Sequence, residues 1–242
     1  MYPIKNKKNR VAYIIITVVL WMTAAAFLCT EAKAESPLSI QAYPGYQGRC
    51  RLGAENPVRI DIESDGEDFD GYMELLAGSR VYRHKVSIKS GTRKSYIFDI
   101  LLSNADDRLI ISCERDGQVV ESISAGPVIL PADSVFIGVL SDRTAEFREF
   151  TSEAEGLLKG KRAVVIPLQD YLEYGINALN NMNLIWVDDF NTRNLSVHDE
   201  ELLQRYVSMG SNIFVDTGAS AYKTLTGMFS GLEAVSPLGE GY

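Results

Sequence analysis

Three apolar segments of this sequence each run into aspartate, and these aspartates are its clearest candidates for chemistry. The segments 134–140, 183–188 and 212–215 are predicted strands, and each of them ends in or runs into acidic residues. Parallel strands would bring these ends to one edge of a sheet, where open parallel sheets bind their ligands. Several carboxylates at such an edge could hold Mg²⁺ or Ca²⁺, or bind a polar ligand. The candidate ligand-binding residues are Asp142, Asp188, Asp189 and Asp216.

The same four positions also suit a purely structural role. Asp and Ser are preferred at helix N-caps and in turns, and each position precedes an expected helix or turn. On that preference we favour capping over a binding site. A binding site would require at least three of these carboxylates to lie within coordinating reach of one point.

Other marks of an active site are missing from the sequence. It has neither a G-x-S-x-G nucleophile elbow nor a phosphate-binding G-x-x-x-x-G-K-[ST] loop. His198 stands beside acids with no nucleophile to pair with, and the residues from 132 onward contain no cysteine. The isolated His84 and the absence of Cys-x-x-Cys argue against a zinc site. We therefore predict no catalytic residues and no cofactor, with a divalent cation as the alternative.

The spacing of apolar residues changes near residue 132, and the new spacing predicts the elements that would position the aspartates. Apolar segments at 134–140, 163–168, 183–188 and 212–215 alternate with expected helices at 144–158 and 171–179 and a third that ends at Gly210. Strands that alternate with helices indicate a parallel sheet flanked by helices. Ser196 is the expected N-cap of the third helix, with Asp199 or Glu200 near the capping-box position. Its expected buried stripe is Leu202, Leu203, Tyr206 and Val207.

The preceding residues, 35–131, have the period of β-strands. Val58, Ile60 and Ile62 alternate with charged residues, and turn sequences such as Ser64-Asp65-Gly66 separate the apolar runs. Short strands at this spacing, with no helical stretch between them, indicate an antiparallel sandwich of immunoglobulin-like type. The expected strands include 58–62, 72–76, 81–88, 95–102, 108–113 and 118–123.

Residues 1–34 have the three parts of a secretory signal. A basic start precedes a stretch without charge at 11–28, and Ala32-Lys33-Ala34 forms an A-x-A cleavage pattern. The apolar run of 18 residues is also long enough to remain as an uncleaved anchor. Lipidation at Cys29 is disfavoured because Leu28 takes the place of a small residue. Either way, we expect the domains to lie outside the cytoplasm.

Export changes the charge and the cysteine count of the chain. Cleavage after Ala34 would remove five Lys or Arg residues and one acid, so the formal charge of −8 would become −12. The remaining sequence holds no basic cluster of the kind that binds nucleic acid. Cys50 and Cys113 would be the two cysteines left. They could form a disulfide worth about 3–4.5 kcal/mol, or stay as two buried thiols.

The second half resembles the class I glutamine amidotransferase-like domains of large exported bacterial proteins. The residues that carry the resemblance are the segments 137–142, 186–190, 195–196, 206–207 and 208–218. There, a strand with Asp precedes a Leu-Ser helix start, a helix, and a strand ending in a small residue and Gly. The resemblance implies a flavodoxin-like fold, a preceding β-sandwich and a membrane-associated role. No residue matches the nucleophilic Cys of true amidotransferases, so that activity is not implied.

These observations give one overall prediction. We expect a signal peptide or anchor at 1–34, a β-sandwich at 35–131, and an α/β flavodoxin-like domain at 132–242 that is incomplete or loosely held at 226–242. The predicted function is that of a non-catalytic cell-envelope protein that contacts an envelope protein or a small polar ligand. The alternative is a metal-assisted hydrolase or transferase that uses the acidic strand ends. The predicted location is secreted, or attached to the outer face of the cytoplasmic membrane.

Overall fold

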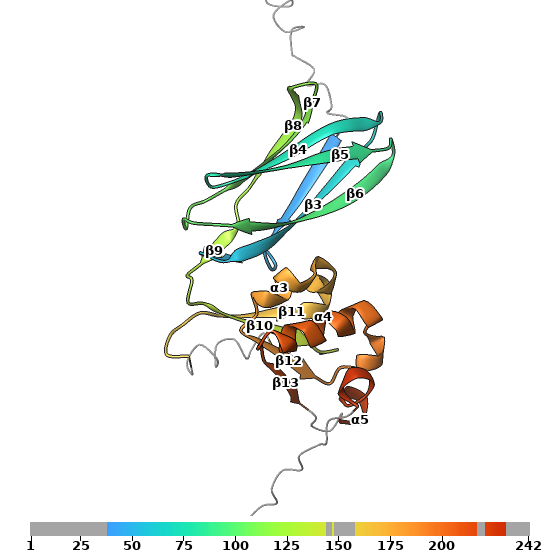
Figure 1. Ribbon diagram of the computed structural model, residues 1–242. Coiled ribbons are helices and arrows are strands. Elements are labelled where there is room, and N and C mark those ends of the chain that lie inside the picture. The colour runs from blue at the N-terminus through green and yellow to red at the C-terminus, as the bar shows by residue number, and fades with distance from the viewer. Residues whose placement is uncertain (1–37, 144–146, 148–157, 217–220, 231–242) are drawn as a thin grey trace, which may run out of the picture. The chain divides into compact units, whose positions relative to one another are not determined.

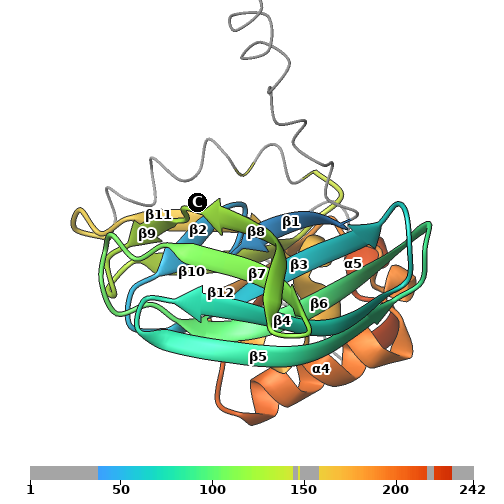
Figure 2. The ribbon, with the colours of Figure 1, turned by 90° about the horizontal axis from the view of Figure 1, so that it is seen from above.

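Alternating apolar residues build the first half of the chain into two facing antiparallel sheets. In the computed structural model, which describes residues 38–143, 147, 158–216 and 221–230, one sheet has the order β1-β3-β6 and the other β5-β4-β7-β8. Figure 1 shows the two layers, and Figure 2 looks down onto the second sheet. The strands are β1 (Leu38–Pro44), β3 (Glu55–Ser64), β4 (Phe69–Ala77), β5 (Arg80–Ile88), β6 (Thr92–Leu101), β7 (Leu109–Arg115) and β8 (Gln118–Ala125).

The core of this sandwich contains the side chains that the period-two pattern selects. Val58, Ile60 and Ile62 of β3 are fully buried, and they share one cluster with Met73 and Leu75 of β4. The six strands expected from the sequence are confirmed. Three further strands were not expected: β1, and the short strands β2 (Arg49–Arg51) and β9 (Val128–Leu130), which pair in parallel.

The second half forms the predicted parallel sheet, in the order β11-β10-β12-β13. Its strands are β10 (Val135–Leu140), β11 (Ala163–Pro167), β12 (Leu184–Asp188) and β13 (Ile213–Asp216). Five of the six residues of β10 are buried, as expected of a strand covered on both faces. Both halves lie within one compact unit, Pro37–Tyr242.

The helices pack on this sheet through a shared apolar cluster. The 3₁₀ helix η1 (Leu168–Tyr174) and the helix α3 (Ile176–Asn180) replace the single helix expected at 171–179, and they are separated at Gly175, which has a φ of 79°. The N-cap of helix α4 (Val197–Ser208) is Ser196, whose hydroxyl and the carboxylate of Asp199 form a capping box. The remaining described helical elements are η2 (Thr192–Asn194), α5 (Ala221–Thr224) and η3 (Gly227–Phe229).

One detail of the predicted burial on α4 is wrong. Leu202, Leu203 and Tyr206 are buried as expected, but Val207 is 47% exposed. On a helix that turns by about 100° per residue, Leu202, Tyr206 and Leu203 share an arc about 100° wide, and Val207 lies about 40° beyond its edge, at the margin of the buried stripe.

Several predictions concern residues outside the described ranges. These are the signal at 1–34, most of the helix at 144–158, Thr217 and Gly218, and the end of the tail at 231–242. Among the residues that the structure describes, no helix is both long and apolar enough to cross a membrane.

Cys50 and Cys113 are both fully buried in the sandwich core, and both are free thiols in this structure. Cys50 lies on β2, which pairs with β9, whereas Cys113 lies on β7, between β4 and β8. Of the two alternatives that the sequence leaves open, a bridge or two buried thiols, this structure has the two thiols. Burial raises the pKa of each thiol to about 12, which keeps both protonated at neutral pH.

Candidate functional site

The strand ends of the parallel sheet bring the predicted aspartates to one edge. Asp188 is the last residue of β12 and stands opposite Asp216, the last residue of β13, in the register of the two strands. Asp142 follows β10, the neighbour of β12 on its other side. Asp189 follows β12 directly, with a backbone φ of 46°. The structure thus places all four residues at the carboxyl ends of adjacent strands, as the sequence predicts.

Two cations hold three of these carboxylates. The Nζ atom of Lys223 on α5 lies 2.6 Å from Asp142 Oδ2 and 3.2 Å from Asp189 Oδ1. The guanidinium of Arg143 approaches Asp188 Oδ2 to 3.4 Å and Asp189 Oδ2 to 3.0 Å. Lys223 also donates a hydrogen bond to the backbone oxygen of Asp189 at 2.9 Å. The edge is an ion-pair network, which we call the strand-end network.

This network differs from the site that the sequence allows. A metal ion needs several carboxylate oxygens directed at one point, but here they are directed at an ammonium and a guanidinium. Within the described ranges, no three His, Cys, Asp or Glu residues are grouped so that they could hold a metal ion. The hydrogen bond to Asp142 raises the pKa of Lys223 above its usual value, so this cation stays charged.

Sequence reasoning selected the acids and missed both cations. Arg143 directly follows Asp142, and this neighbouring opposite charge is the one signal that could have pointed to it. Lys223 lies 34 residues from Asp189 and enters the network only because α5 folds back onto the strand ends. Neither Asp188 nor Asp189 caps the helix that follows β12, because the N-cap of η2 is Asn191.

A cleft of about 740 Å³ opens beside the strand-end network. Asp142 lies on one side, and η1 and the start of α4 contribute Gln169, Glu173 and His198. The cleft is therefore where an open parallel sheet would place a ligand. His198 is exposed, as expected of a surface residue.

A second pocket depends on a turn of the sandwich that enters the other half. The turn 45–48 connects β1 to β2 and places Tyr46 in the core of the parallel-sheet half, where it is fully buried. Its hydroxyl donates to the backbone oxygen of Ala178 at 2.6 Å, and its ring meets Phe136 edge to face. The backbone N–H of Gln47 donates to the hydroxyl of Tyr171 at 2.7 Å.

Further contacts fix the two halves together around this turn. Arg51 donates to Asn183 Oδ1 at 2.6 Å and stacks over the ring of Phe136. On the opposite side, Asn181 donates to the backbone oxygen of Glu55. Because these contacts involve side chains and backbone from both halves, the turn is held in one orientation.

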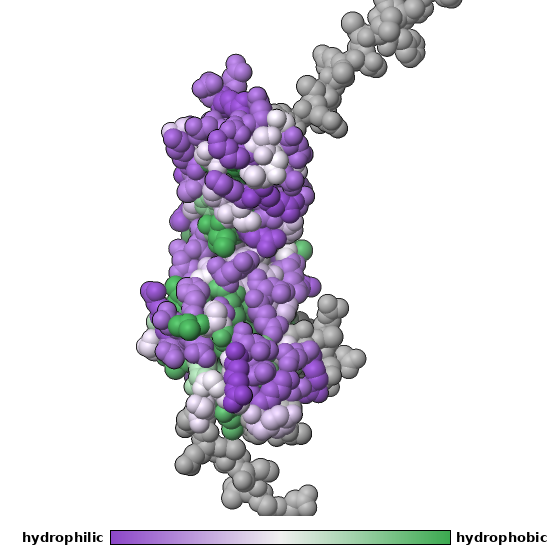
Figure 3. Space-filling view, turned by 90° about the vertical axis from the view of Figure 1, so that its right-hand side faces the viewer, coloured by the Kyte–Doolittle hydropathy of each residue, from purple (hydrophilic) through white to green (hydrophobic). Residues whose placement is uncertain are grey.

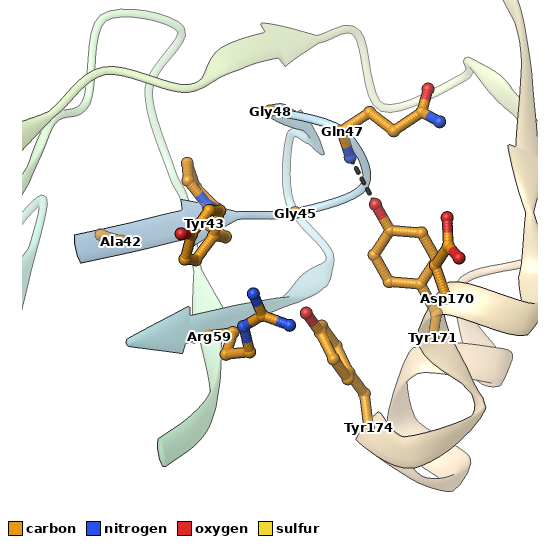
Figure 4. A pocket seen from close by; sticks show the side chains of 10 residues that line it. Ala42, Tyr43, Gly45, Gln47, Gly48, Arg59, Asp170, Tyr171 and Tyr174 are labelled. Atoms are coloured by element: carbon orange, nitrogen blue, oxygen red, sulfur yellow. Dashed lines mark hydrogen bonds between the residues drawn. The ribbon is translucent and has the colours of Figure 1, made fainter. Parts of the chain in front are cut away.

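The resulting pocket, which we call the junction pocket, has a volume of about 380 Å³ and is shown in Figure 4. Strands β1 and β3 and the turn form one wall, and η1 forms the other. Its lining combines aromatic rings, one positive and one negative side chain, and the backbone of two glycines. The lining residues are Ala42, Tyr43, Pro44, Gly45, Gln47, Gly48, Arg59, Asp170, Tyr171 and Tyr174.

The side chain of Arg59 is held in place in the wall of the junction pocket. Its guanidinium lies over the ring of Tyr43, 4.5 Å from the ring centre, and within ion-pair distance of Asp61 and Glu173, at 3.3 and 3.7 Å. Figure 4 shows the hydroxyl of Tyr174 directed toward this guanidinium. The arginine is thus held by groups from both halves and keeps its place in the wall.

The hydroxyls of η1 remain hydrogen-bond donors across a wide pH range. Burial raises the pKa of Tyr171 and of Tyr174, partly offset for Tyr174 by the charge of Arg59. Tyr171 already accepts a hydrogen bond from Gln47, so its own proton is available to another acceptor. Sequence reasoning missed this pocket altogether, because Tyr43, Arg59 and Tyr171 form no motif and meet only in the folded chain.

A family described as a domain of unknown function, DUF8726, matches residues 37–126 of this chain. That range spans most of the sandwich and none of the parallel sheet. A search of curated proteins finds no match to this chain.

Solved structures match the sandwich at low similarity. The crystal structure of a CARDB domain from Pyrococcus furiosus, in complex with di-metal ions, matches 38% of this chain and 87% of its own, with 11% identity and a TM-score of 0.33. A β-glucosidase from Listeria innocua matches 40% of this chain but only 16% of its own, with 11% identity and a TM-score of 0.28. The assignment of a sandwich therefore rests on the sheet order and shared core described above.

Proposed function

We propose that this protein is a non-catalytic binding protein of the cell envelope, which acts outside the cytoplasm. The observation that carries the proposal is the pairing of Asp142, Asp188 and Asp189 with Lys223 and Arg143. A metal-assisted enzyme would need these carboxylates for its ion. Their engagement by two cations favours a structural role for the strand ends and leaves binding as the task of the pockets.

The proposed location rests on the sequence at the N-terminus. The basic start, apolar stretch and A-x-A pattern of residues 1–34 are those of an export signal. Processing at this site predicts a mature protein that begins at Glu35, which mass determination of the purified protein would detect. A protein that keeps residues 1–34 in the membrane fraction would support the anchored alternative.

The proposed relationship to amidotransferase-like domains has one structural support. The order β11-β10-β12-β13 places the second strand of this half at one edge, followed by the first, third and fourth. This is the order in which flavodoxin-like sheets begin. We also propose domain boundaries at 35–131 and 132–242.

Calorimetric titration of Mg²⁺, Ca²⁺ and Mn²⁺ into the purified protein tests the non-catalytic role. We expect no saturable heat from any of the three ions. The matched control is Asp188→Ala, which removes one carboxylate of the strand-end network.

The alternative function is a metal-assisted hydrolase or transferase, and the cleft beside Asp142 is the observation that favours it. Saturable heat with the natural protein that disappears in Asp188→Ala would support this alternative and contradict the non-catalytic role.

A further inference from the structure

The junction pocket has the chemistry of a binding site for a neutral, polyhydroxylated ligand. Three tyrosines line it, and two of them, Tyr171 and Tyr174, stand on η1 opposite Tyr43. Pockets that hold small molecules combine aromatic walls with a few fixed polar groups, at volumes from about 300 Å³ upward. The junction pocket meets both conditions.

The charges around the pocket disfavour ligands that carry a net charge. An anion would have to compete with Asp61 and Glu173, which already lie at the guanidinium of Arg59. A cation seeking the aromatic faces would meet Arg59, which already occupies the face of Tyr43. A lining with one positive and one negative side chain, Arg59 and Asp170, is complementary to a ligand without net charge.

The polar groups that remain both donate and accept hydrogen bonds. Arg59 and the hydroxyl of Tyr171 can donate, while the exposed carboxylate of Asp170 can only accept. Hydroxyl groups satisfy both kinds of partner at once, because each donates one hydrogen bond and accepts others. Aromatic rings beside them call for a ligand that also has an apolar C–H face.

A sugar ring has this combination of hydroxyls at its edge and C–H groups on its faces. We propose that the junction pocket binds a neutral saccharide, as one ring of a free sugar or of a polysaccharide. This inference rests on the proposed binding role and names its ligand class. The site is already in place without a ligand, since the Gln47–Tyr171 hydrogen bond and the Tyr46–Ala178 hydrogen bond hold its walls.

Amide chemical shifts of the ¹⁵N-labelled protein test this inference at the pocket itself. The probes are glucose, N-acetylglucosamine, cellobiose and chitobiose, with phosphate and tetramethylammonium as the anionic and cationic comparisons. We expect at least one saccharide to shift the amides of Gln47 and Gly48 in a saturable manner. Tighter binding of the disaccharides than of the single sugars would indicate a polysaccharide as the source, and equal binding a free sugar.

Variants separate binding from folding. Asp170→Ala removes an exposed acceptor, and Tyr174→Phe removes one hydroxyl while keeping the ring. We expect each to weaken saccharide binding at least fivefold, with the remaining amide spectrum unchanged. The matched control is Tyr72→Ala, because Tyr72 lies under Arg83 at 4.3 Å on the other sheet, in the same kind of pair as Tyr43 and Arg59. It should leave the affinity within twofold.

Two results would overturn the saccharide assignment. Saturable shifts of Gln47 with phosphate or tetramethylammonium, and with no saccharide, would show a binding pocket of another class. Saccharide binding that survives Asp170→Ala and Tyr174→Phe would place the sugar elsewhere. Neither result touches the non-catalytic role, which the divalent-ion titration tests at the strand-end network.

Discussion

The hydroxyl of Tyr46, on a turn of the β-sandwich, donates a hydrogen bond to the backbone oxygen of Ala178, in a helix of the parallel-sheet half. The two residues are 132 positions apart in the chain, and both are fully buried. A side chain of one half is therefore part of the core of the other. The junction pocket is built on this turn, so its walls depend on the same contact.

Tyr46→Phe is expected to destabilise the protein by about 1–3 kcal/mol, because the buried oxygen of Ala178 would lose its partner. Urea denaturation followed by fluorescence and by circular dichroism measures this loss. The unfolding midpoints measured by the two probes should shift together in the variant, because the hydrogen bond joins the two halves. Tyr43→Phe, whose exposed hydroxyl donates to Gln41, is the matched control and should change stability by less than about 0.5 kcal/mol.

Gly45→Ala should be one of the most damaging small substitutions in the chain. Gly45 has a φ of 58°, and a Cβ atom there would lie 2.0 Å from the backbone oxygen of Arg49. Left-handed backbone and overpacking together predict a loss of about 2–5 kcal/mol. Gly53→Ala has a similar φ of 72° with open space around the new atom, so it should cost only about 1–2 kcal/mol. If Gly45→Ala and Gly53→Ala lost the same free energy of unfolding in a denaturation series, backbone strain alone would account for the loss at Gly45.

Local patterns in the sequence were enough to predict most of the fold. The period-two burial of Val58, Ile60 and Ile62 and the nearly continuous burial of β10 follow directly from residue type and spacing. Strands as short as β2 and β9 carry no such signal, because three residues cannot show a period. The surface facing the viewer in Figure 3 is mostly hydrophilic, as expected of a chain in which 23% of the residues are charged.

The candidate sites were predictable only in part. The rule for parallel strand ends located Asp142 and Asp189 at one edge, but it could not reveal that Lys223 would fold back onto them. The junction pocket lay beyond any local pattern, because Tyr43 and Tyr174 belong to different halves and come together through Tyr46. Contacts between distant segments depend on packing, and a single sequence does not display them.

Lys223→Met should turn the strand-end network into a weak cation site. The substitution keeps the length of the side chain but removes the charge that lies between Asp142 and Asp189. Carboxylates that lose their partner favour a divalent ion in its place. Calorimetry with Ca²⁺ should then give saturable heat that the natural protein lacks, and the double variant with Asp142→Asn should lose it again. A flat titration of Lys223→Met would contradict this prediction.

The two buried thiols should be unreactive in the native protein and fully reactive once it unfolds. Burial raises the pKa of Cys50 and Cys113 to about 12, and the thiolate is the form that reacts with alkylating agents. Iodoacetamide at pH 8 should therefore label neither residue until denaturant is added without reductant, when mass spectrometry should show two additions to the mature chain. No addition under those conditions would reveal a disulfide.

The same raised pKa predicts a pH effect on stability, since a group with a higher pKa in the folded state stabilises the fold only while it is protonated in both states. Stability should hold below about pH 8.5, the usual thiol pKa, and decline as the pH rises toward 12. Cys50→Ala and Cys113→Ala together should flatten that decline in a denaturation series between pH 8 and 11.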